Sequence, residues 1–342
     1  MAIIVMDGFD HYPDAAGEYF ASVEGYTHEH NPERSDAHSA DTRWDYGKCL
    51  EIYWDGPFRI AIGNAATNTI FVSMAFKYTS AENRDILKIL DANGNQHAKY
   101  HLDSSGYVYA SDASGTVQGT STGIIAPNIW YWMEMKTKVD STTGTMQIKI
   151  DEVDAFTPLT GLDTQNGATT PLIGWVRFTS GSDNYTYFDD LIIQDDTGDF
   201  LGDSRIETFM PASDVGTPDW TNTGAGSNAA DVSVIGSTME DDYVYSATST
   251  DVDLYDVGAL SEEDTVHAVA THTRAMKDST AAVAFKSRTK SGTNERDGAS
   301  NTLVSSYAWT TYTDIFEWTD DAESIAWNKT LFDAAQFGVE VV

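Results

Sequence analysis

Residues 131–150 have the sequence YWMEMKTKVDSTTGTMQIKI. Apolar and polar side chains alternate over residues 131–139, and the alternation resumes over residues 146–150. Side chains two apart on a β-strand share a face, so each half predicts a strand with one buried face. The residues between them, Asp140-Ser141-Thr142-Thr143-Gly144, are typical of a tight turn. We therefore predict an antiparallel hairpin here.

The same period-two pattern recurs along most of the chain. Residues 69–78 form the longest such segment, and other short segments are bounded by Gly, Asn, Asp or Ser. This spacing favours β-sandwiches and jelly rolls over βαβ units. The further predicted strands are residues 47–54, 58–63, 85–90, 106–110, 173–179, 185–193, 232–235, 243–246 and 252–257.

A turn-rich segment after residue 193 indicates a domain boundary. We predict a first domain over residues 1–202 and a second, smaller β-sandwich over residues 203–342, in which residues 221–231 form an exposed loop. Helical periodicity is confined to residues 330–336, which Asn328 would cap and Gly338 would end before a final strand. The expected fold class is all-β, with two sandwich domains and one short helix.

Charge excludes several partners. The chain has 20 Lys and Arg against 53 Asp and Glu, a formal net charge of −33. Residues 1–202 hold 12 basic and 29 acidic side chains, and residues 203–342 hold 8 and 24, so both halves are expected to repel anions. Nucleic acid and anionic membrane surfaces are therefore not expected partners. No signal peptide or membrane span is expected either.

Two patterns that could carry chemistry are interpreted as structural. Glu152 and Asp154 match two positions of the Glu-x-Asp-x-x-Glu motif of β-sandwich glucanases, but Thr157 stands where the third acid belongs. We expect a solvated hairpin edge there. The His28/His30 and His97/His101 pairs have spacings that could begin a metal site, but their polar surroundings favour surface histidines, the second pair in a loop.

Clustered aspartates suggest a calcium site. Asp189 and Asp190 lie near the end of the first domain, and Asp7 and Asp10 lie at its start. Carboxylate oxygens are the ligands that Ca²⁺ prefers, and these residues meet if the first and last strands pair. We therefore predict Asp7, Asp189 and Asp190 as candidate Ca²⁺ ligands, with no other cofactor. The single cysteine, Cys49, is expected to pack as a small apolar side chain.

Short segments of core aromatics and turn residues point to a known family. They are Met6-Asp7-Gly8-Phe9-Asp10-His11-Tyr12, Trp130-Tyr131-Trp132-Met133-Glu134, Thr142-Thr143-Gly144-Thr145, Tyr187-Phe188-Asp189-Asp190-Leu191, the junction 200–205, and in the second half 219–221, 241–245, 253–255 and 327–338. Through them the chain resembles the concanavalin A-like, laminin G-like jelly-roll domain of tailed-phage structural proteins. The resemblance implies that residues 1–202 form such a jelly roll.

The resemblance also implies a function without enzymatic activity. It indicates a virion protein on a capsid or tail that contacts other virion proteins as an oligomer or in many copies on a lattice. Two alternatives stay open: a host-adsorption protein whose jelly roll binds a surface glycan, and a glycan hydrolase. Tyr107, Tyr109, Trp175 and Tyr185 could lie on a sheet face for sugar stacking, but core packing is the preferred interpretation.

Overall fold

The computed structural model of the chain is nearly all β. It describes residues 2–12, 26–28, 35–38, 42–44, 47–53, 57–62, 67–80, 82–165, 170–180, 184–233, 241–261, 265–303, 307–320 and 322–342. The chain divides into two compact units, with the change from unit 1 to unit 2 between Ile206 and Glu207. No helix among the described residues is long and apolar enough to cross a membrane.

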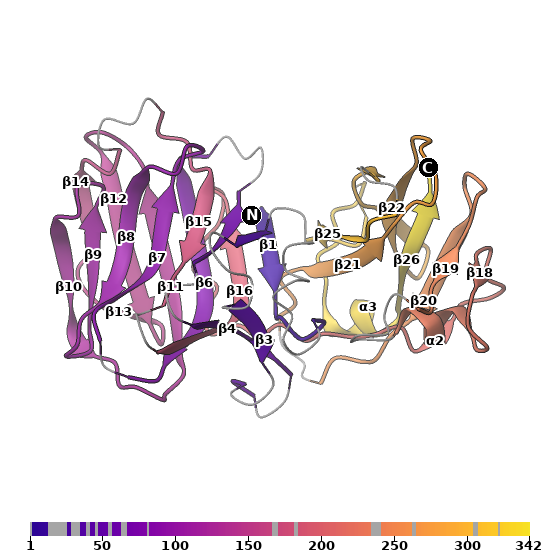
Figure 1. Cartoon of the computed structure of the whole chain (residues 1–342), viewed down its shortest axis with the longest axis horizontal. Helices are drawn as coiled ribbons and strands as arrows, with labels where there is room; N and C mark the ends of the chain where they lie inside the picture. The colour runs from indigo at the N-terminus through magenta and orange to yellow at the C-terminus, as the bar shows by residue number, and fades with distance from the viewer. Residues whose placement is uncertain are drawn as a thin grey trace. The chain divides into compact units, whose positions relative to one another are not determined.

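Unit 1 is built from two antiparallel sheets (Figure 1). The nine-stranded sheet contains β1 (Ile3–Asp7), β3 (Ser35–His38), β4 (Cys49–Tyr53), β6 (Thr69–Tyr78), β11 (Tyr131–Lys138), β12 (Gly144–Ile150), β13 (Val153–Asp154), β14 (Leu159–Leu162) and β16 (Tyr185–Gln194). The seven-stranded sheet contains β2 (Tyr26–His28), β5 (Phe58–Ala61), β7 (Arg84–Leu90), β8 (Gln96–Leu102), β9 (Tyr107–Asp112), β10 (Val117–Ile124) and β15 (Trp175–Phe178).

The predicted hairpin is confirmed as β11 and β12, which pair from Met133 opposite Ile150 to Lys138 opposite Thr145. The Asp140 carboxylate closes the turn by accepting hydrogen bonds from the backbone N–H groups of Thr142 and Thr143, both at 2.8 Å. These bonds to the charged form lower the pKa of Asp140 to about 2. Local alternation and turn chemistry were therefore sufficient to place this element.

The core of unit 1 lies between the two sheets. Nearly all side chains of β6 and most of β11 are buried, including Met74, Phe76 and Met133, and Cys49 is buried as predicted. The first and last strands pair, with Asp7 opposite Leu191. The prediction of a loop around His97 and His101 was wrong, because these residues belong to β8, where a buried polar residue, His97, next to the buried Ala98 interrupts the alternation.

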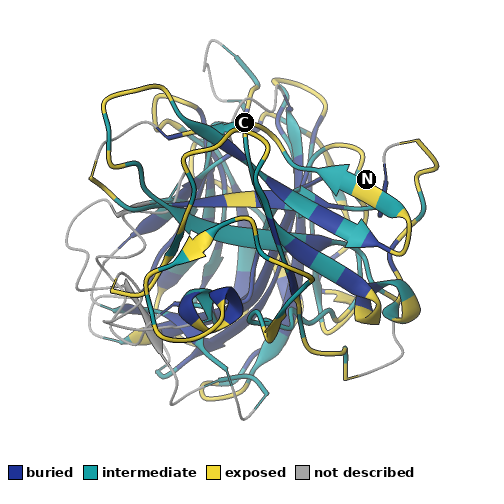
Figure 2. Ribbon diagram, turned by 90° about the vertical axis from the view of Figure 1, so that its right-hand side faces the viewer, coloured by how far each residue is buried: buried dark blue, intermediate teal, exposed yellow. Residues whose placement is uncertain are grey.

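Unit 2 is a second β assembly with one six-stranded sheet. This sheet contains β17 (Ser213–Asp214), β20 (Val252–Asp256), β22 (Ala284–Ser291), β23 (Asn294–Asp297), β24 (Asn301–Thr302) and β26 (Ala335–Val341), and two ribbons join β18 (Thr221–Asn222) to β19 (Val244–Tyr245) and β21 (Val269–Ala275) to β25 (Thr310–Phe316). The ring of Phe285 in β22 contacts Tyr312 in β25, with centroids 5.3 Å apart, so this ribbon packs on the sheet. Figure 2 shows buried positions concentrated in strands and exposed positions in the connecting loops.

Three predictions for unit 2 were wrong. Residues 221–231 are not a loop throughout, because α2 (Asn228–Val232) forms there with Ser227 as its N-cap and buries Asn228 and Ala229. The same helix takes Val232 out of the strand predicted at 232–235, of which residues 234 and 235 lie outside the described residues. Helix α3 (Lys329–Asp333) does begin after Asn328, but it ends before β26, so Gly338 lies inside a strand.

Candidate functional site

The predicted calcium ligands already accept hydrogen bonds from protein donors. Asp7 Oδ1 accepts from the Phe9 backbone N–H at 2.7 Å, and Asp7 Oδ2 accepts from the hydroxyls of Tyr12 and Tyr26 at 3.0 and 2.7 Å. Among the described residues, no group of three or more His, Cys, Asp or Glu side chains is arranged to hold a metal ion. Calcium binding at Asp7, Asp189 and Asp190 stays a prediction.

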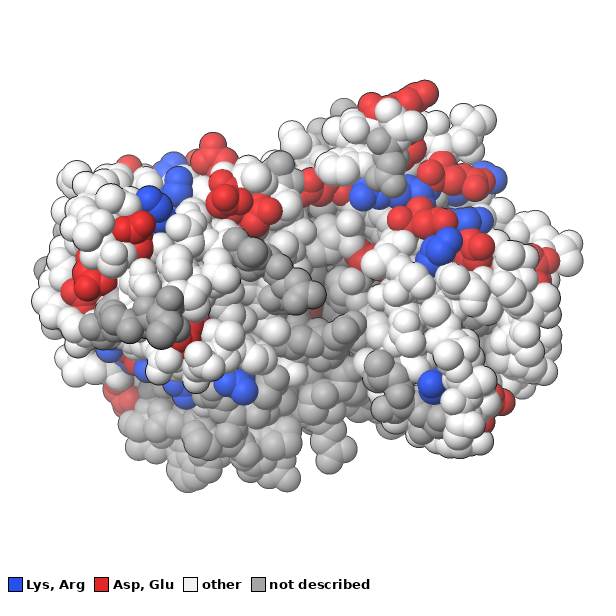
Figure 3. All heavy atoms as spheres, turned by 90° about the horizontal axis from the view of Figure 1, so that it is seen from above, with Lys and Arg blue, Asp and Glu red and all other residues white. Residues whose placement is uncertain are grey.

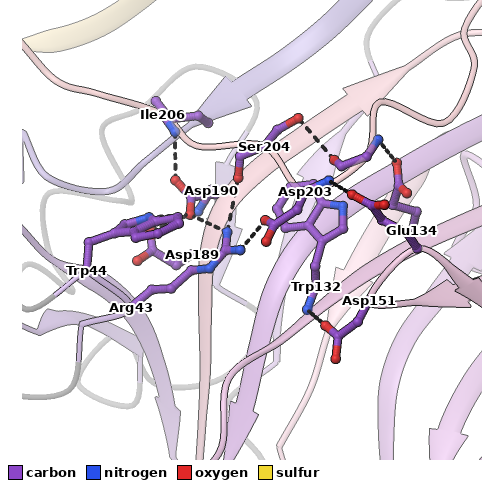
Figure 4. Close-up of polar contacts among 12 residues, drawn as sticks. Arg43, Trp44, Trp132, Glu134, Asp151, Asp189, Asp190, Asp203, Ser204 and Ile206 are labelled. Atoms are coloured by element: carbon purple, nitrogen blue, oxygen red, sulfur yellow. Dashed lines mark hydrogen bonds and ion pairs between the residues drawn. The ribbon is translucent and has the colours of Figure 1, made fainter. Parts of the chain in front are cut away.

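Asp190 belongs to a buried polar cluster that holds the end of unit 1 (Figure 4). Its Oδ2 accepts from Arg43 at 2.9 Å and from the Trp44 indole at 3.0 Å, and its Oδ1 accepts from the Ile206 N–H at 2.7 Å. Arg43 also binds the Ser204 carbonyl and pairs with Asp203. The cluster therefore fastens the segment before residue 207 to the nine-stranded sheet, which is a structural task.

Asp189 gives this cluster a pH dependence. Burial, and then the neighbouring charge of Asp190, raise the pKa of Asp189 to about 9. A carboxyl whose pKa is raised on folding contributes stability below about pH 4, and loses it as pH rises toward the folded value. Asp189→Asn stays neutral, so we expect its melting temperature to exceed that of the wild type by several degrees at pH 8 and to match it near pH 4. Thermal unfolding at both pH values tests this, and an equal shift at both would contradict it.

The two acids of the partial glucanase motif lie on an exposed edge, as predicted. Glu152 and Asp154 are both exposed around β13. Glu152 accepts a bond from the Asp203 N–H at 3.3 Å, whereas Asp154 accepts one from the Gln147 amide at 2.8 Å. Each carboxylate thus has its own local partner, and the structure does not bring them together over a cavity.

A pocket of about 680 Å³ instead lies on the seven-stranded sheet. We call it the cationic pocket; its lining residues are Pro57, Asn83, Arg84, Asp85, Lys88, Lys99, His101, Leu102, Asp103, Tyr109, Arg177, Thr179 and Ser180. Most of them come from β7, β8, β9 and β15, or from the ends of these strands, which lie side by side in Figure 1. Five of them are Lys, Arg or His.

Strand register places four cations in one row across this sheet. Arg177 in β15 lies opposite Arg59 in β5 and opposite Lys88 in β7, and Lys88 lies opposite Lys99 in β8. The sequence neighbours of these residues are mostly buried, so the four side chains share the face that points away from the core. Like charges directly opposite one another destabilise a sheet, which makes such a row costly unless anions meet it.

Asp85 meets two of these cations. Its carboxylate pairs with Lys88 Nζ at 2.7 Å and with Lys99 Nζ at 3.0 Å. A β-bulge between Asp85 and Leu87 lets Asp85 and Lys88 face the same side although they are three residues apart. Burial alone would raise the pKa of Asp85, but the hydrogen bonds and charges of the two lysines outweigh burial and lower it.

His101 and Tyr109 form a cross-strand pair beside the cations. They lie opposite one another in β8 and β9, with ring centroids 5.1 Å apart in an edge-to-face arrangement. Burial, and then the charge of Lys99, lower the pKa of His101 from 6.5, so its ring is neutral at neutral pH. The Tyr109 hydroxyl donates to Asp103 Oδ2 at 2.8 Å, and this bond is the main cause that raises the pKa of Tyr109. The pocket thus holds a neutral imidazole next to a protonated phenol.

Several sequence-based interpretations are corrected by these positions. His97 is fully buried and not a surface histidine, while His101 faces the pocket with 21% of its side chain exposed. In the predicted His28/His30 pair, His30 lies outside the described residues. Core packing was the wrong role for the four aromatics, since Tyr107 and Tyr185 are exposed and Tyr109 and Trp175 lie on the outward face of their sheet.

The repulsion of anions expected from composition stays a prediction, and the row of cations is a local exception to the excess of acidic residues. Charges of both signs are mixed on other parts of the surface as well, and Figure 3 shows one view in which Lys and Arg spheres lie beside Asp and Glu spheres. In unit 2, for example, Arg288 pairs with both Asp297 and Glu340. The cation row differs because its members come from four strands far apart in sequence, so no window of the sequence reveals it.

No protein-family model matches the chain, and no curated protein matches it. Among solved structures, an alginate lyase from a Chlorella virus is 13% identical with a TM-score of 0.37, covering 46% of this chain and 89% of its own. A carbohydrate esterase from the Shiga toxin-encoding bacteriophage phi24B is 14% identical with a TM-score of 0.37, covering 56% of this chain and 99% of its own. A beta-glucanase catalytic domain from Podospora anserina is 11% identical with a TM-score of 0.39, covering 59% of this chain and 98% of its own.

These structures are named as glycan-processing enzymes, two of them viral. The prediction of a structural virion protein without enzymatic activity is contradicted by this set of neighbours, and it is wrong. At such identities and TM-scores, the likeness gives no argument for a particular reaction or substrate. A particular activity has to be inferred from the cationic pocket itself.

Proposed function

We propose that the cationic pocket binds an acidic polysaccharide and cleaves it by β-elimination next to a uronate carboxylate. The observation that carries this proposal is the row of four cations beside the His101–Tyr109 pair, on a chain whose net charge is −33. A local group of cations on a protein whose net charge is negative favours an anionic ligand at this place. The side chains of Lys88, Lys99 and His101 are 20–21% exposed, so they are partly desolvated yet reachable.

The chemistry follows from the groups present. Lys88, Lys99 and Arg177 would neutralise the substrate carboxylate, which makes the proton on the adjacent carbon C5 more acidic. The neutral His101 ring would take that proton as its electron pair forms the C4=C5 double bond and the C4–O4 bond breaks. Tyr109 would donate its proton to the departing O4. Exchange with water returns the proton from His101 and reprotonates Tyr109, and no water enters the products.

Hydrolysis in this pocket is less well supported. Glycoside hydrolases generally need one carboxyl that stays protonated, which requires a raised pKa. Both carboxyls of the pocket have lowered pKa values, although burial opposes this: Asp85 through its two lysines, and Asp103 through the Tyr107 N–H, the Tyr109 hydroxyl and two further backbone N–H groups. The proposed proton donor in this pocket is therefore the Tyr109 hydroxyl and not a carboxyl.

The experiment that tests the proposal is incubation of the purified protein with polygalacturonate, alginate and hyaluronan. Elimination creates a double bond conjugated with the carboxylate, so ultraviolet absorbance rises as chains shorten. A rise on at least one polymer supports the proposal. Chain shortening with no new absorbance would mean hydrolysis, and no shortening of any acidic polymer would reject the proposal.

Activity should depend on pH through His101. The base works when neutral, and its pKa lies below 6.5, so we expect activity to be level above about pH 6.5 and to fall at lower pH. Asp85 lies 3.9 Å from His101 Nδ1 and raises the pKa of His101. In Asp85→Asn the acid limb of the pH–rate profile should therefore move to lower pH. Asp140→Asn, at the distant hairpin turn, is the matched control, and an unmoved limb in Asp85→Asn would contradict the assignment.

For the biological setting, we propose that the protein is carried on a virion and meets an acidic glycan on a host cell. This is the adsorption alternative with cleavage added to binding. Protein retention on host cells before and after enzymatic removal of their acidic polysaccharides tests it. Retention that does not change after removal would count against this setting.

A further inference from the structure

We propose that unit 2 carries a binding site for a quaternary ammonium group of the choline type, formed by Tyr243, Tyr245 and Trp309. These three residues are called the aromatic cluster below; their rings contact one another in sequence, with Tyr243 in the middle. The inference goes beyond the proposed function. It uses none of the residues that line the cationic pocket, and its ligand has the opposite charge.

The ribbon of β18 and β19 displays two of the three rings (Figure 1). Tyr243 precedes β19 and Tyr245 ends it, so the two side chains share a face, and they are 37% and 52% exposed. The Thr223 hydroxyl accepts from the Tyr243 N–H at 2.9 Å and donates to the Tyr243 carbonyl at 3.0 Å. The backbone below the central ring is therefore fixed from both sides. Trp309 is half-buried and directly precedes β25.

The inclination of the rings favours a compact ligand over a flat one. The ring of Tyr243 lies 6.4 Å from that of Tyr245 at an angle of 61°, and 5.9 Å from that of Trp309 at 66°. Rings inclined in this way form walls, whereas a sugar ring stacks on a flat aromatic surface. A cation is attracted to an aromatic ring within about 6 Å of its centroid. A quaternary ammonium group in the angle between two of these rings therefore lies within reach of both.

The charge of the surrounding chain also favours a cation. Residues 206–273 contain 13 Asp and Glu and no Lys or Arg. Two of these acids, Asp241 and Asp242, directly precede Tyr243 and are both exposed. Exposed carboxylates attract a positively charged ligand and repel an acidic polymer. The aromatic cluster is thus complementary to an organic cation in both geometry and charge.

Isothermal titration calorimetry with choline chloride tests the site. The matched ligand is 3,3-dimethylbutan-1-ol, which has the shape of choline without its charge. We expect choline to bind the wild type with a Kd of about 1 mM, and the alcohol to bind at least about tenfold more weakly. Tyr243→Leu removes the ring that both pairs share and should weaken choline binding about tenfold. Tyr243→Phe keeps the ring and should bind choline nearly as the wild type does.

Two further variants locate the site and its charge. Tyr107→Leu is the matched control, because Tyr107 is 38% exposed but lies in β9 of unit 1. Replacing both Asp241 and Asp242 with asparagine should lower the affinity for choline several-fold and reduce its dependence on salt. Retention on phosphatidylcholine vesicles or on a polysaccharide that bears phosphocholine, in each case released by free choline, distinguishes a lipid from a glycan as the source of the group.

The inference fails if choline gives no heat of binding, or if the uncharged alcohol binds as tightly as choline. Equal losses of affinity in Tyr243→Leu and Tyr107→Leu would also overturn it. If Tyr243→Leu has a lower melting temperature, the double variant Tyr245→Leu with Trp309→Leu replaces it, and wild-type affinity in that protein would contradict the site. His101→Ala should bind choline as the wild type does, so this result does not depend on whether the cationic pocket cleaves a polymer.

Discussion

Replacing His101 with alanine is expected to lower kcat on an acidic polysaccharide by a factor of about 10² to 10⁴, the usual contribution of a positioned general base. His101 is the neutral imidazole of the pocket, and it lies 5.1 Å from the ring of Tyr109, the proposed proton donor. Its removal leaves the cations in place, so the protein should still bind the polymer. Initial rates of ultraviolet absorbance and binding to the immobilised polymer measure the two effects separately.

Two further variants make this result specific. Tyr109→Phe keeps the ring but removes the hydroxyl that donates to Asp103, so kcat should fall while the acid limb set by His101 remains. His267→Ala in unit 2 is the matched control, because burial also lowers the pKa of this histidine although it does not line the pocket. If His101→Ala retained wild-type kcat, a different residue would have to be the base.

Replacing Gly338 with alanine is expected to destabilise unit 2 by about 3 kcal/mol, at the upper end of the range for overpacked sites. A Cβ atom at this position would lie 1.8 Å from the Asp253 carbonyl oxygen and 3.0 Å from Leu254 Cα. Leu254 is the residue paired with Gly338 between β20 and β26, so the obstacle is backbone that cannot rotate away. The melting temperature of unit 2 should fall by about 10 °C.

Gly123→Ala serves as the control for this prediction. Gly123 also lies in a strand, β10, but nothing stands within 4 Å of the position its Cβ would take. The melting temperature of Gly123→Ala should stay close to that of the wild type. Circular dichroism during heating measures both variants. A Gly338→Ala protein as stable as Gly123→Ala would mean that β20 and β26 do not approach as closely as described.

Gly338 also shows where sequence reasoning failed. A glycine after a helical segment is typical of a helix end, and the sequence predicts that role. The glycine is instead required inside β26, because the neighbouring strand β20 passes too close for a side chain. Close approach between strands depends on packing and not on local pattern. Likewise, residues 98–102 do alternate in the sequence, but the buried polar His97 next to the buried Ala98 interrupts the pattern at the start of β8, and burial of a histidine is decided by packing.

Sequence alone was enough for the all-β class, the hairpin at residues 131–150, the buried Cys49 and the capping of α3 by Asn328. These features follow from period-two alternation, turn chemistry and capping, which act between residues close in the chain. The cationic pocket was decided by tertiary structure. Its row joins Arg59, Lys88, Lys99 and Arg177, which become neighbours only through the order and register of four strands. Strand pairing over such sequence distances is set by the packing of the whole sandwich, so the composition showed an acidic protein and concealed its cationic face.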